Sequence, residues 1–154
     1  MNTNAASVVD ASVLIKLFLQ EDQSEAVQQI IDDIYLNHAI PASLIVPDLM
    51  FVECANILRT KVRFHGYPPQ TAIQAMRYLR ALALPTTASA DLVEDVLSIA
   101  FVYDISAYDA VYVALAGQQH ISLITADARL AQQLHGSPYS LISIEDYLSL
   151  MTQD

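Results

Sequence analysis

The stretch SVVDASVLIKLF, residues 7–18, joins two hydrophobic patterns at one carboxylate. Ser7 to Asp10 is a short apolar run that ends in an aspartate, as a buried strand can. The apolar residues after it follow the spacing of one helix face: Val13, Leu14, Leu17 and Phe18. The sequence therefore predicts a strand followed by a helix, with Asp10 at the carboxyl end of the strand.

The same alternation of strand and helix continues along the chain. Further strands are predicted at 44–46, 84–88, 121–125 and 141–144. Helices are predicted at 23–36, after Asp48, and at 70–84, 91–103, 107–117, 127–134 and 145–150. Such alternation favours a parallel sheet with helices on both faces, and ligands of such folds bind outside the carboxyl ends of the strands.

Details of three helices are also predicted. Asp48 and Ser106 have the residue types and positions of N-caps. In the helix at 91–103, the apolar residues expected on one side are Leu92, Val93, Val96, Leu97 and Ala100. Pro85 is expected to end the helix at 70–84.

Composition sets the class of protein. The 154 residues fit a single domain, 1–154, and 54% hydrophobic content suggests that some apolar surface meets another chain. Cys54 is the only cysteine, which excludes an internal disulfide and suits the cytoplasm. Residues 1–6 lack the basic start of a secretory signal, and polar residues interrupt the apolar stretch 105–126, so no membrane span is expected.

The charge is strongly acidic. Seventeen acidic residues against seven basic ones give a net charge of −10, which argues against broad, salt-driven coating of nucleic acid. Local basic clusters could still meet an anionic substrate. They are Arg59, Lys61 and Arg63 in one group and Arg77 and Arg80 in another, and ordinary solvated helix faces are the alternative.

Four carboxylates are placed to meet at one edge of the predicted sheet: Asp10, Glu53, Asp109 and Asp127. Closely packed carboxylates repel one another unless a cation neutralises them. Oxygen ligands without nearby His or Cys favour Mg²⁺ or Mn²⁺, which can orient water for attack on phosphorus. Simpler roles remain open. Asp127 could be a plain helix N-cap, and Asp109 could be a solvated first-turn residue that the helix dipole stabilises.

Two other side chains near the predicted site have weaker indications. Lys16 could approach a phosphate, although a lysine at a helix edge is more often solvated. The tyrosines at 103, 108 and 112 could stack on RNA bases, but packing is the favoured interpretation.

Four segments together resemble the successive motifs of PIN-domain proteins, in the family's order and over nearly the whole chain. They are VVDASVLIKLFL, PDLMFVECANIL, SAYDAVYVALA and LITADARL. The resemblance implies a three-layer α/β/α sandwich around a mainly parallel sheet and a metal-dependent endoribonuclease. It also implies that Asp10, Glu53, Asp109 and Asp127 hold the metal, with Ser12 and Thr125 as supporting hydroxyls.

Within that family the chain is most similar to VapC-type toxins of toxin–antitoxin pairs. This similarity implies an RNA substrate, a small antitoxin that covers the active site, and a homodimer. A free-standing PIN nuclease and a non-catalytic PIN-fold binding module are the alternatives. Two other α/β classes also use an aspartate after a strand, but the sequence does not clearly meet their requirements. A haloacid-dehalogenase-like phosphatase would have a second aspartate where Ser12 stands. A receiver domain would have paired acidic residues before its first helix and a lysine after its last core strand.

Overall fold

Five short strands form one sheet in the computed structural model, which describes residues 6–39 and 42–153. The strands are β1 (Ser7–Val9), β2 (Leu44–Pro47), β3 (Thr86–Thr87), β4 (Leu123–Ile124) and β5 (Leu141–Ile142). Their order is β3-β2-β1-β4-β5, and every neighbouring pair is parallel. The prediction of a parallel α/β sheet is confirmed.

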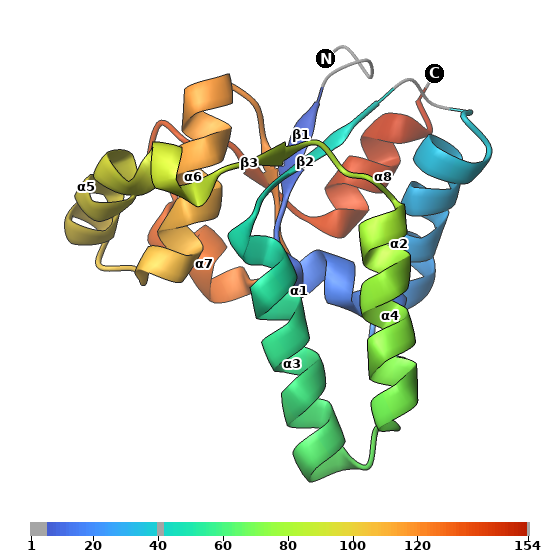
Figure 1. The fold of residues 1–154 in the computed structure, drawn as a ribbon. Coiled ribbons are helices and arrows are strands. Elements are labelled where there is room, and N and C mark those ends of the chain that lie inside the picture. The colour runs from blue at the N-terminus through green and yellow to red at the C-terminus, as the bar shows by residue number, and fades with distance from the viewer. Residues whose placement is uncertain (1–5, 40–41, 154) are drawn as a thin grey trace.

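Helices enclose this sheet from both sides, and Figure 1 shows α5, α6 and α7 on one side of the strands and α2, α4 and α8 on the other. The α-helices are α1 (Ala11–Leu14), α2 (Ser24–Ile31), α3 (Leu49–His65), α4 (Pro69–Ala81), α5 (Val93–Tyr103), α6 (Ala107–Gln119), α7 (Ala128–Gln133) and α8 (Ile144–Met151). Short 3₁₀ or π segments extend three of them: η1 (Ile15–Leu17), η2 (Asp32–Leu36) and η3 (Ser89–Leu92).

The strand order places a topological switch point between β1 and β4. From the central β1, the chain moves outward to β2 and β3, and then returns to the other side of β1 to form β4 and β5. The connections therefore diverge at the carboxyl ends of β1 and β4. This is where ligands bind in open α/β sheets.

Helix α6 lies at the centre of the core. Its residues 110–116 are all buried, because the helix contacts α5 as well as β1 and β2. A helix that is apolar all round is expected where neighbours cover every face. Asp109 immediately precedes this buried run and is therefore fixed at the edge of the core.

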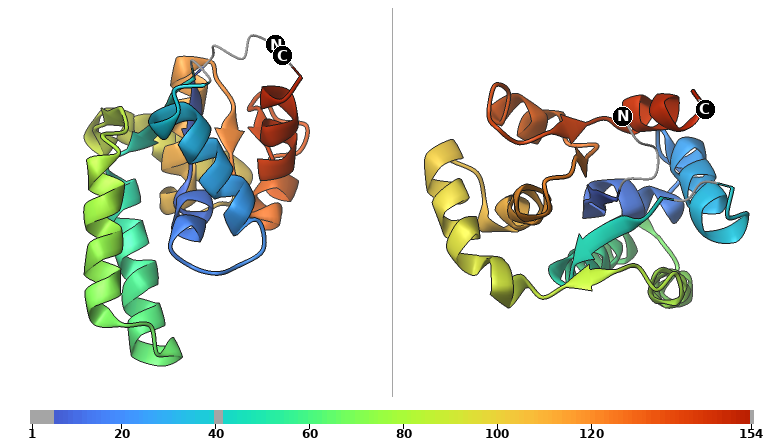
Figure 2. Two further views of the ribbon diagram at one scale, coloured as in Figure 1. Left: turned by 90° about the vertical axis from the view of Figure 1, so that its right-hand side faces the viewer. Right: turned by 90° about the horizontal axis from the view of Figure 1, so that it is seen from above.

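Helices α3 and α4 form a hairpin that projects from the sheet, as Figure 1 and the left-hand view of Figure 2 show. Gly66 ends α3 with a φ of 69°, a left-handed conformation that glycine adopts without a Cβ clash. Pro69 occupies the first turn of α4, where a missing N–H costs nothing. Most residues next to this turn are exposed, both at the end of α3 and at the start of α4.

Three details of the sequence prediction are wrong. The helix predicted at 70–84 ends at Ala81, and the chain has already turned at Ala83 (φ 51°), so Pro85 lies beyond the helix and does not end it. Asp48 makes no capping hydrogen bond to α3, because β3 pairs with β2 and brings Ser89 close; the Asp48 carboxylate accepts from the Ser89 N–H at 3.0 Å and from its hydroxyl. In α5, Val93 and Leu97 are exposed rather than on the packed side, which is formed by Leu92, Val96 and Ile99.

In the part of the chain that the structure describes, no single helix is long and apolar enough to cross a membrane. One pair, Ser89–Tyr103 with Ala107–Gln119, passes by length and composition but is bent by 113°.

Candidate functional site

Asp10 is buried at the carboxyl end of β1, beside the switch point. Its carboxylate accepts hydrogen bonds from the Ser12 hydroxyl (2.5 Å), the Val13 N–H (3.2 Å) and the Thr125 hydroxyl (2.5 Å). Burial raises its pKa to about 6, although these three hydrogen bonds oppose the shift, and the charge of Asp127 raises it further. The side chain is therefore held rigidly, and its negative charge is only partly stabilised.

The two predicted hydroxyl residues connect the ends of β1 and β4. Besides donating to Asp10, Ser12 accepts from the Ala126 N–H at 3.1 Å and Thr125 accepts from the Asp127 N–H at 3.0 Å. Each hydroxyl thus bridges the carboxylate of one strand and the backbone that follows the other. This network orients both Asp10 and the segment that carries Asp127.

Asp127 begins α7 and caps it. One carboxylate oxygen, Oδ1, accepts from the N–H groups of Arg129 (2.9 Å) and Leu130 (3.1 Å). An N-cap of this kind stabilises a helix but occupies only one of the two oxygens. Asp127 therefore caps the helix and still adds charge to the site, as the pKa of Asp10 shows.

Asp109 lies in the first turn of α6, where Ser106 acts as the predicted N-cap and accepts from the Asp109 N–H at 3.1 Å. Desolvation by burial raises the pKa of Asp109, and the charge of Asp127 adds to this. The Ser106 hydroxyl and the positive charge of Arg129 oppose it. Asp109 and Asp127 are thus electrostatic neighbours.

Glu53 reaches the site from the first half of α3. Burial raises its pKa to about 7; the nearby Tyr112 hydroxyl opposes this, and the charges of Asp109 and Asp10 add to it. In the described part of the chain, neither Glu53 Oε1 nor the Tyr112 hydroxyl has a hydrogen-bond partner, and both atoms are buried. A buried carboxylate oxygen without a partner is unusual and indicates a site for a further ligand.

The structure therefore brings all four predicted carboxylates into one electrostatically coupled group. Oxygen donors with an unsatisfied Glu53 suit a hard divalent cation, which would relieve the repulsion that adds to the effect of burial on these pKa values. As the described side chains lie, however, no three His, Cys, Asp or Glu residues could hold a metal ion together. Because hydrogen bonds hold the Asp10 and Asp127 carboxylates in place, a bound ion would have to draw Asp109 and Glu53 closer to them.

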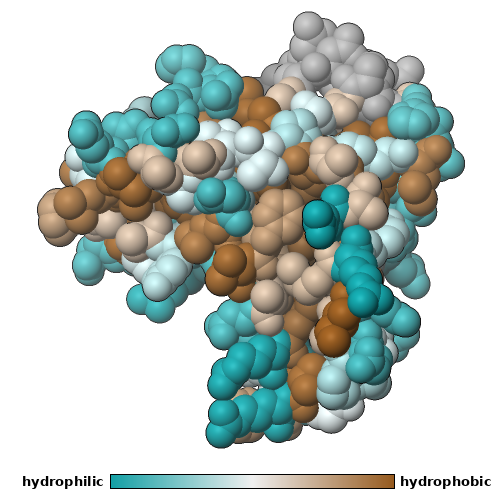
Figure 3. Space-filling model, viewed as in Figure 1, coloured by the Kyte–Doolittle hydropathy of each residue, from teal (hydrophilic) through white to brown (hydrophobic). Residues whose placement is uncertain are grey.

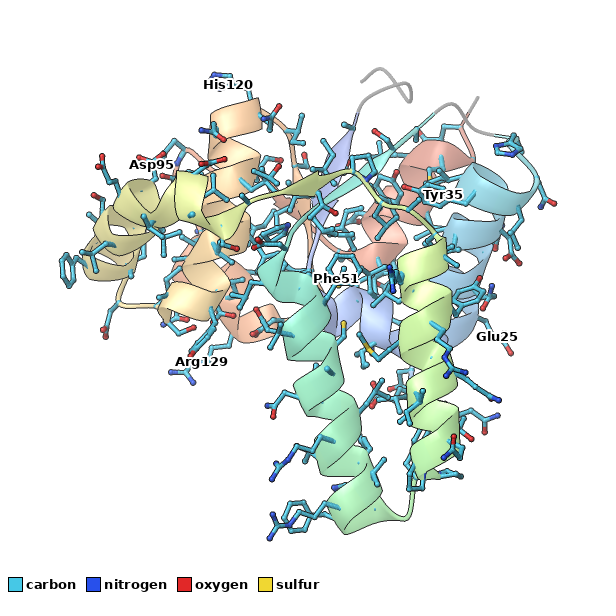
Figure 4. All side chains as sticks on the ribbon, viewed as in Figure 1. Glu25, Tyr35, Phe51, Asp95, His120 and Arg129 are labelled. Carbon is cyan, nitrogen blue, oxygen red and sulfur yellow. The ribbon has the colours of Figure 1, made fainter. Side chains whose placement is uncertain are left out.

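Two residues at this site were not predicted from the sequence. Tyr112 was assigned to packing, and it is buried, but its hydroxyl also faces Glu53. Its position three residues after Asp109, on the same helix face, was the available signal. Arg129 directs its side chain outward from α7 (Figure 4), and its charge acts on Asp109. Lys16 does not serve the site, because its ammonium group binds Glu21 (3.5 Å) and the Asp22 carbonyl (3.0 Å).

Comparisons with known proteins identify the family of this chain. The model of the PIN domain family matches residues 7–133. Ribonuclease VapC3 of Pyrobaculum aerophilum is 29% identical over 128 residues, which cover 82% of this chain and 92% of that protein.

Solved structures show the same fold. PAE2754 from Pyrobaculum aerophilum has a TM-score of 0.72 at 20% identity, covering 98% of this chain and 92% of the other. A toxin–antitoxin complex from Klebsiella pneumoniae has a TM-score of 0.60 at 18% identity, covering 90% of this chain and 97% of the other. VapC20 of Mycobacterium tuberculosis, a toxin that cleaves the sarcin–ricin loop, has a TM-score of 0.60 at 17% identity, covering 81% of this chain and 92% of the other.

Proposed function

Because the chain belongs to the PIN domain family, we propose that it is a divalent-metal-dependent endoribonuclease, formed by a single domain and using Mg²⁺ or Mn²⁺. The observation that carries this proposal is the coupled group of four carboxylates at the switch point of the sheet. Repulsion among these groups is costly, and a purely structural role gives no reason to retain it.

Asp10, Asp109 and Asp127 are the proposed metal ligands, with Glu53 assisting. A divalent ion bound there would supply a Lewis acid and lower the pKa of bound water. Ser12 and Thr125 hold Asp10 in one orientation, so that its position does not change when substrate arrives. The cap at Asp127 fixes the second ligand in the same way.

Glu53 is the proposed general base. Hydrolysis of a phosphodiester requires that water lose a proton as it attacks phosphorus and that the departing 3′ oxygen gain one. The Glu53 carboxylate can accept the first proton; its pKa is about 7 in the metal-free protein, and a bound cation would lower it. Its buried, unpartnered Oε1 is available for a water molecule.

The same family suggests partners for this chain. We propose that it is the toxin of a toxin–antitoxin pair, with a small antitoxin that covers the carboxylates, and that it is a homodimer. Similarity to Ribonuclease VapC3 and to the fold of a solved toxin–antitoxin complex supports the first part. A cytoplasmic location stays a prediction from the single free Cys54.

The test is cleavage of a mixed pool of structured RNAs by the purified protein, with Mg²⁺, with Mn²⁺ and with EDTA. Asp10→Asn is the inactive variant, and Asp104→Asn is the matched control. Asp104 is exposed and has a φ of 52°, which asparagine adopts readily, so this second change alters charge without strain.

Cutting that requires metal and is lost only in Asp10→Asn is the expected result. Equal cutting in EDTA would overturn the metal requirement. Metal binding by calorimetry without any cutting would favour the non-catalytic binding module. Cutting that the protein of an adjacent short reading frame fails to inhibit would favour a free-standing nuclease.

A further inference from the structure

A groove of about 660 Å³ runs along the α3–α4 hairpin, and none of the four carboxylates lines it. Aliphatic side chains form its floor, among them Leu58, Ile73 and Met76. Four arginines line it as well: Arg59 and Arg63 from α3, and Arg77 and Arg80 from α4. Figure 3 shows this hydrophobic strip running down the projecting hairpin between hydrophilic edges.

Charge is strongly segregated between the hairpin and the remainder of the molecule. Residues 49–81 hold five of the seven Lys and Arg residues and one of the seventeen Asp and Glu residues. Ion pairs in the described part of the chain involve only Lys16 and Lys61, both with Glu21, so the four groove arginines have no carboxylate partner there. The groove therefore suits an apolar surface bordered by negative charge.

Helix α5 presents such a surface on the same chain. Its outer side exposes large apolar residues one turn apart, namely Val93 (56% exposed), Leu97 (53%) and Phe101 (77%). Residues 89–104 also contain four acidic residues and no basic one. Figure 3 shows this hydrophobic end of the molecule, on the lobe that α5 forms. Isolated exposed apolar residues are common, but an aligned stripe of three with acidic neighbours indicates an interaction surface.

The two surfaces have matching lengths. From Val93 to Phe101 the α5 stripe spans nine residues, or about 12 Å of helix, and the α3 wall from Ala55 to Arg63 spans the same distance. Within one molecule they cannot meet, because α5 lies at the opposite side of the sheet from α4 and away from the hairpin (Figures 1 and 2).

We propose that the α3–α4 groove of one molecule receives the acidic, apolar face of α5 from a second copy of this chain. Two such contacts related by a two-fold axis close a dimer and bury both exposed surfaces of each molecule. This inference rests on the homodimer in the proposed function and assigns its interface. It does not depend on the nuclease reaction.

The groove fits a helix better than RNA. Single-stranded RNA is bound by basic grooves that also offer aromatic rings for base stacking, and the lining of this groove contains none. Its apolar floor instead matches the recognition of an amphipathic helix, in which spaced aliphatic and aromatic anchors enter the groove. Phe101, the most exposed large apolar residue in the described chain, is the expected anchor.

The test is sedimentation velocity over a range of concentrations with two variants of the full chain. Phe101→Asp alters the α5 stripe and Ile73→Asp alters the groove; both side chains are exposed, so neither change should disturb the core. Each variant alone is expected to raise the dimer dissociation constant about 30-fold or more, as loss of an interface anchor does. Leu36→Asp, at an exposed site outside both surfaces, is the control and should dimerise as the wild type does.

Mixing the two variants makes the test specific. The intact groove of Phe101→Asp can receive the intact stripe of Ile73→Asp, so a heterodimer keeps one unaltered contact, whereas each variant paired with itself keeps none. Because two changes within the same contact cost less than the sum of both, a labelled mixture is expected to form heterodimers more tightly than either variant pairs with itself. Three results would overturn the proposal. The first is a monomeric wild type, and the second is full dimerisation of Ile73→Asp alone. The third is an Ile73→Asp variant that no longer binds RNA or another protein but still dimerises. Because sedimentation needs no catalysis, a failed cleavage assay and a failed dimer test are separate outcomes.

Discussion

The carboxyl group of Glu53 makes stability depend on pH. Its pKa is about 7 in the folded protein against an ordinary 4.5, so the unfolded chain releases this proton first as pH rises. The contribution of Glu53 to the free energy of unfolding is therefore fully present below about pH 4.5 and is lost as pH rises through 7, in metal-free buffer. Asp10, with a pKa of about 6, adds a fall between about pH 4 and 6.

Replacing Glu53 by glutamine should remove its part of this effect. At pH 8 in EDTA, Glu53→Gln is expected to unfold with a free energy about 1–2 kcal/mol higher than the wild type, and at pH 4.5 the two should agree. Urea titrations at both pH values measure this. An equal decline with pH in both proteins would show that Glu53 ionises in the folded state without penalty.

Arg129 is the exposed cation whose charge reaches the site, and we expect it to contact a phosphate of the RNA. In an Asp10→Asn background, which allows binding without cleavage, Arg129→Ala should weaken RNA binding. It should also reduce the dependence of log affinity on log salt by roughly one unit, as expected for one lost phosphate contact. An unchanged salt dependence would exclude such a contact.

Residue types at motif positions were sufficient to predict which four carboxylates influence one another and which two hydroxyls bind Asp10, while their catalytic role stays a prediction. They were insufficient for Tyr112 and Arg129, whose relevance depends on which side chain packing places opposite them. Asp48 shows the same limit: a local rule predicted a cap, but a nonlocal strand pairing provided Ser89 as a stronger partner.

At the scale of elements, α7 depends on Asp127 both for its first turn and for the charge of the site. Serine caps a helix about as well as aspartate but carries no charge. Asp127→Ser should therefore unfold within about 0.5 kcal/mol of the wild type and lose cleavage, whereas Asp127→Ala should lose cleavage and about 1 kcal/mol of stability. Urea unfolding and RNA cleavage separate the two roles. Wild-type cleavage by Asp127→Ser would show that this residue is only a cap.

Helix positions were predictable, but the buried side of α5 was not. Its sequence is apolar nearly all round, so periodicity alone could not distinguish the residues that pack on α6 from those facing outward. Val93 and Leu97 were consequently assigned to the wrong side. The error coincides with the surface proposed for dimerisation, where apolar residues serve a contact outside the monomer.

At the scale of the whole molecule, alternation of strands and helices predicted a parallel sheet but not its order. Several right-handed arrangements satisfy the same alternation, and long-range packing selects among them. The observed order β3-β2-β1-β4-β5 is what brings Asp10 and Asp127 together at one switch point. The segregation of charge is already visible in the sequence, but that the basic segment projects from an acidic body is visible only in three dimensions.

The most direct test of the central claim is the single-turnover rate of RNA cleavage at saturating Mg²⁺ for the wild type, Asp10→Asn and Asp104→Asn. The account predicts that Asp10→Asn is slower by at least about a hundredfold, or ~2.7 kcal/mol of activation free energy, while its urea unfolding remains cooperative. Asp104→Asn should stay within about twofold of the wild type, since its charge lies outside the site. Cleavage by well-folded Asp10→Asn at the wild-type rate would contradict the assignment of this carboxylate group as the active site.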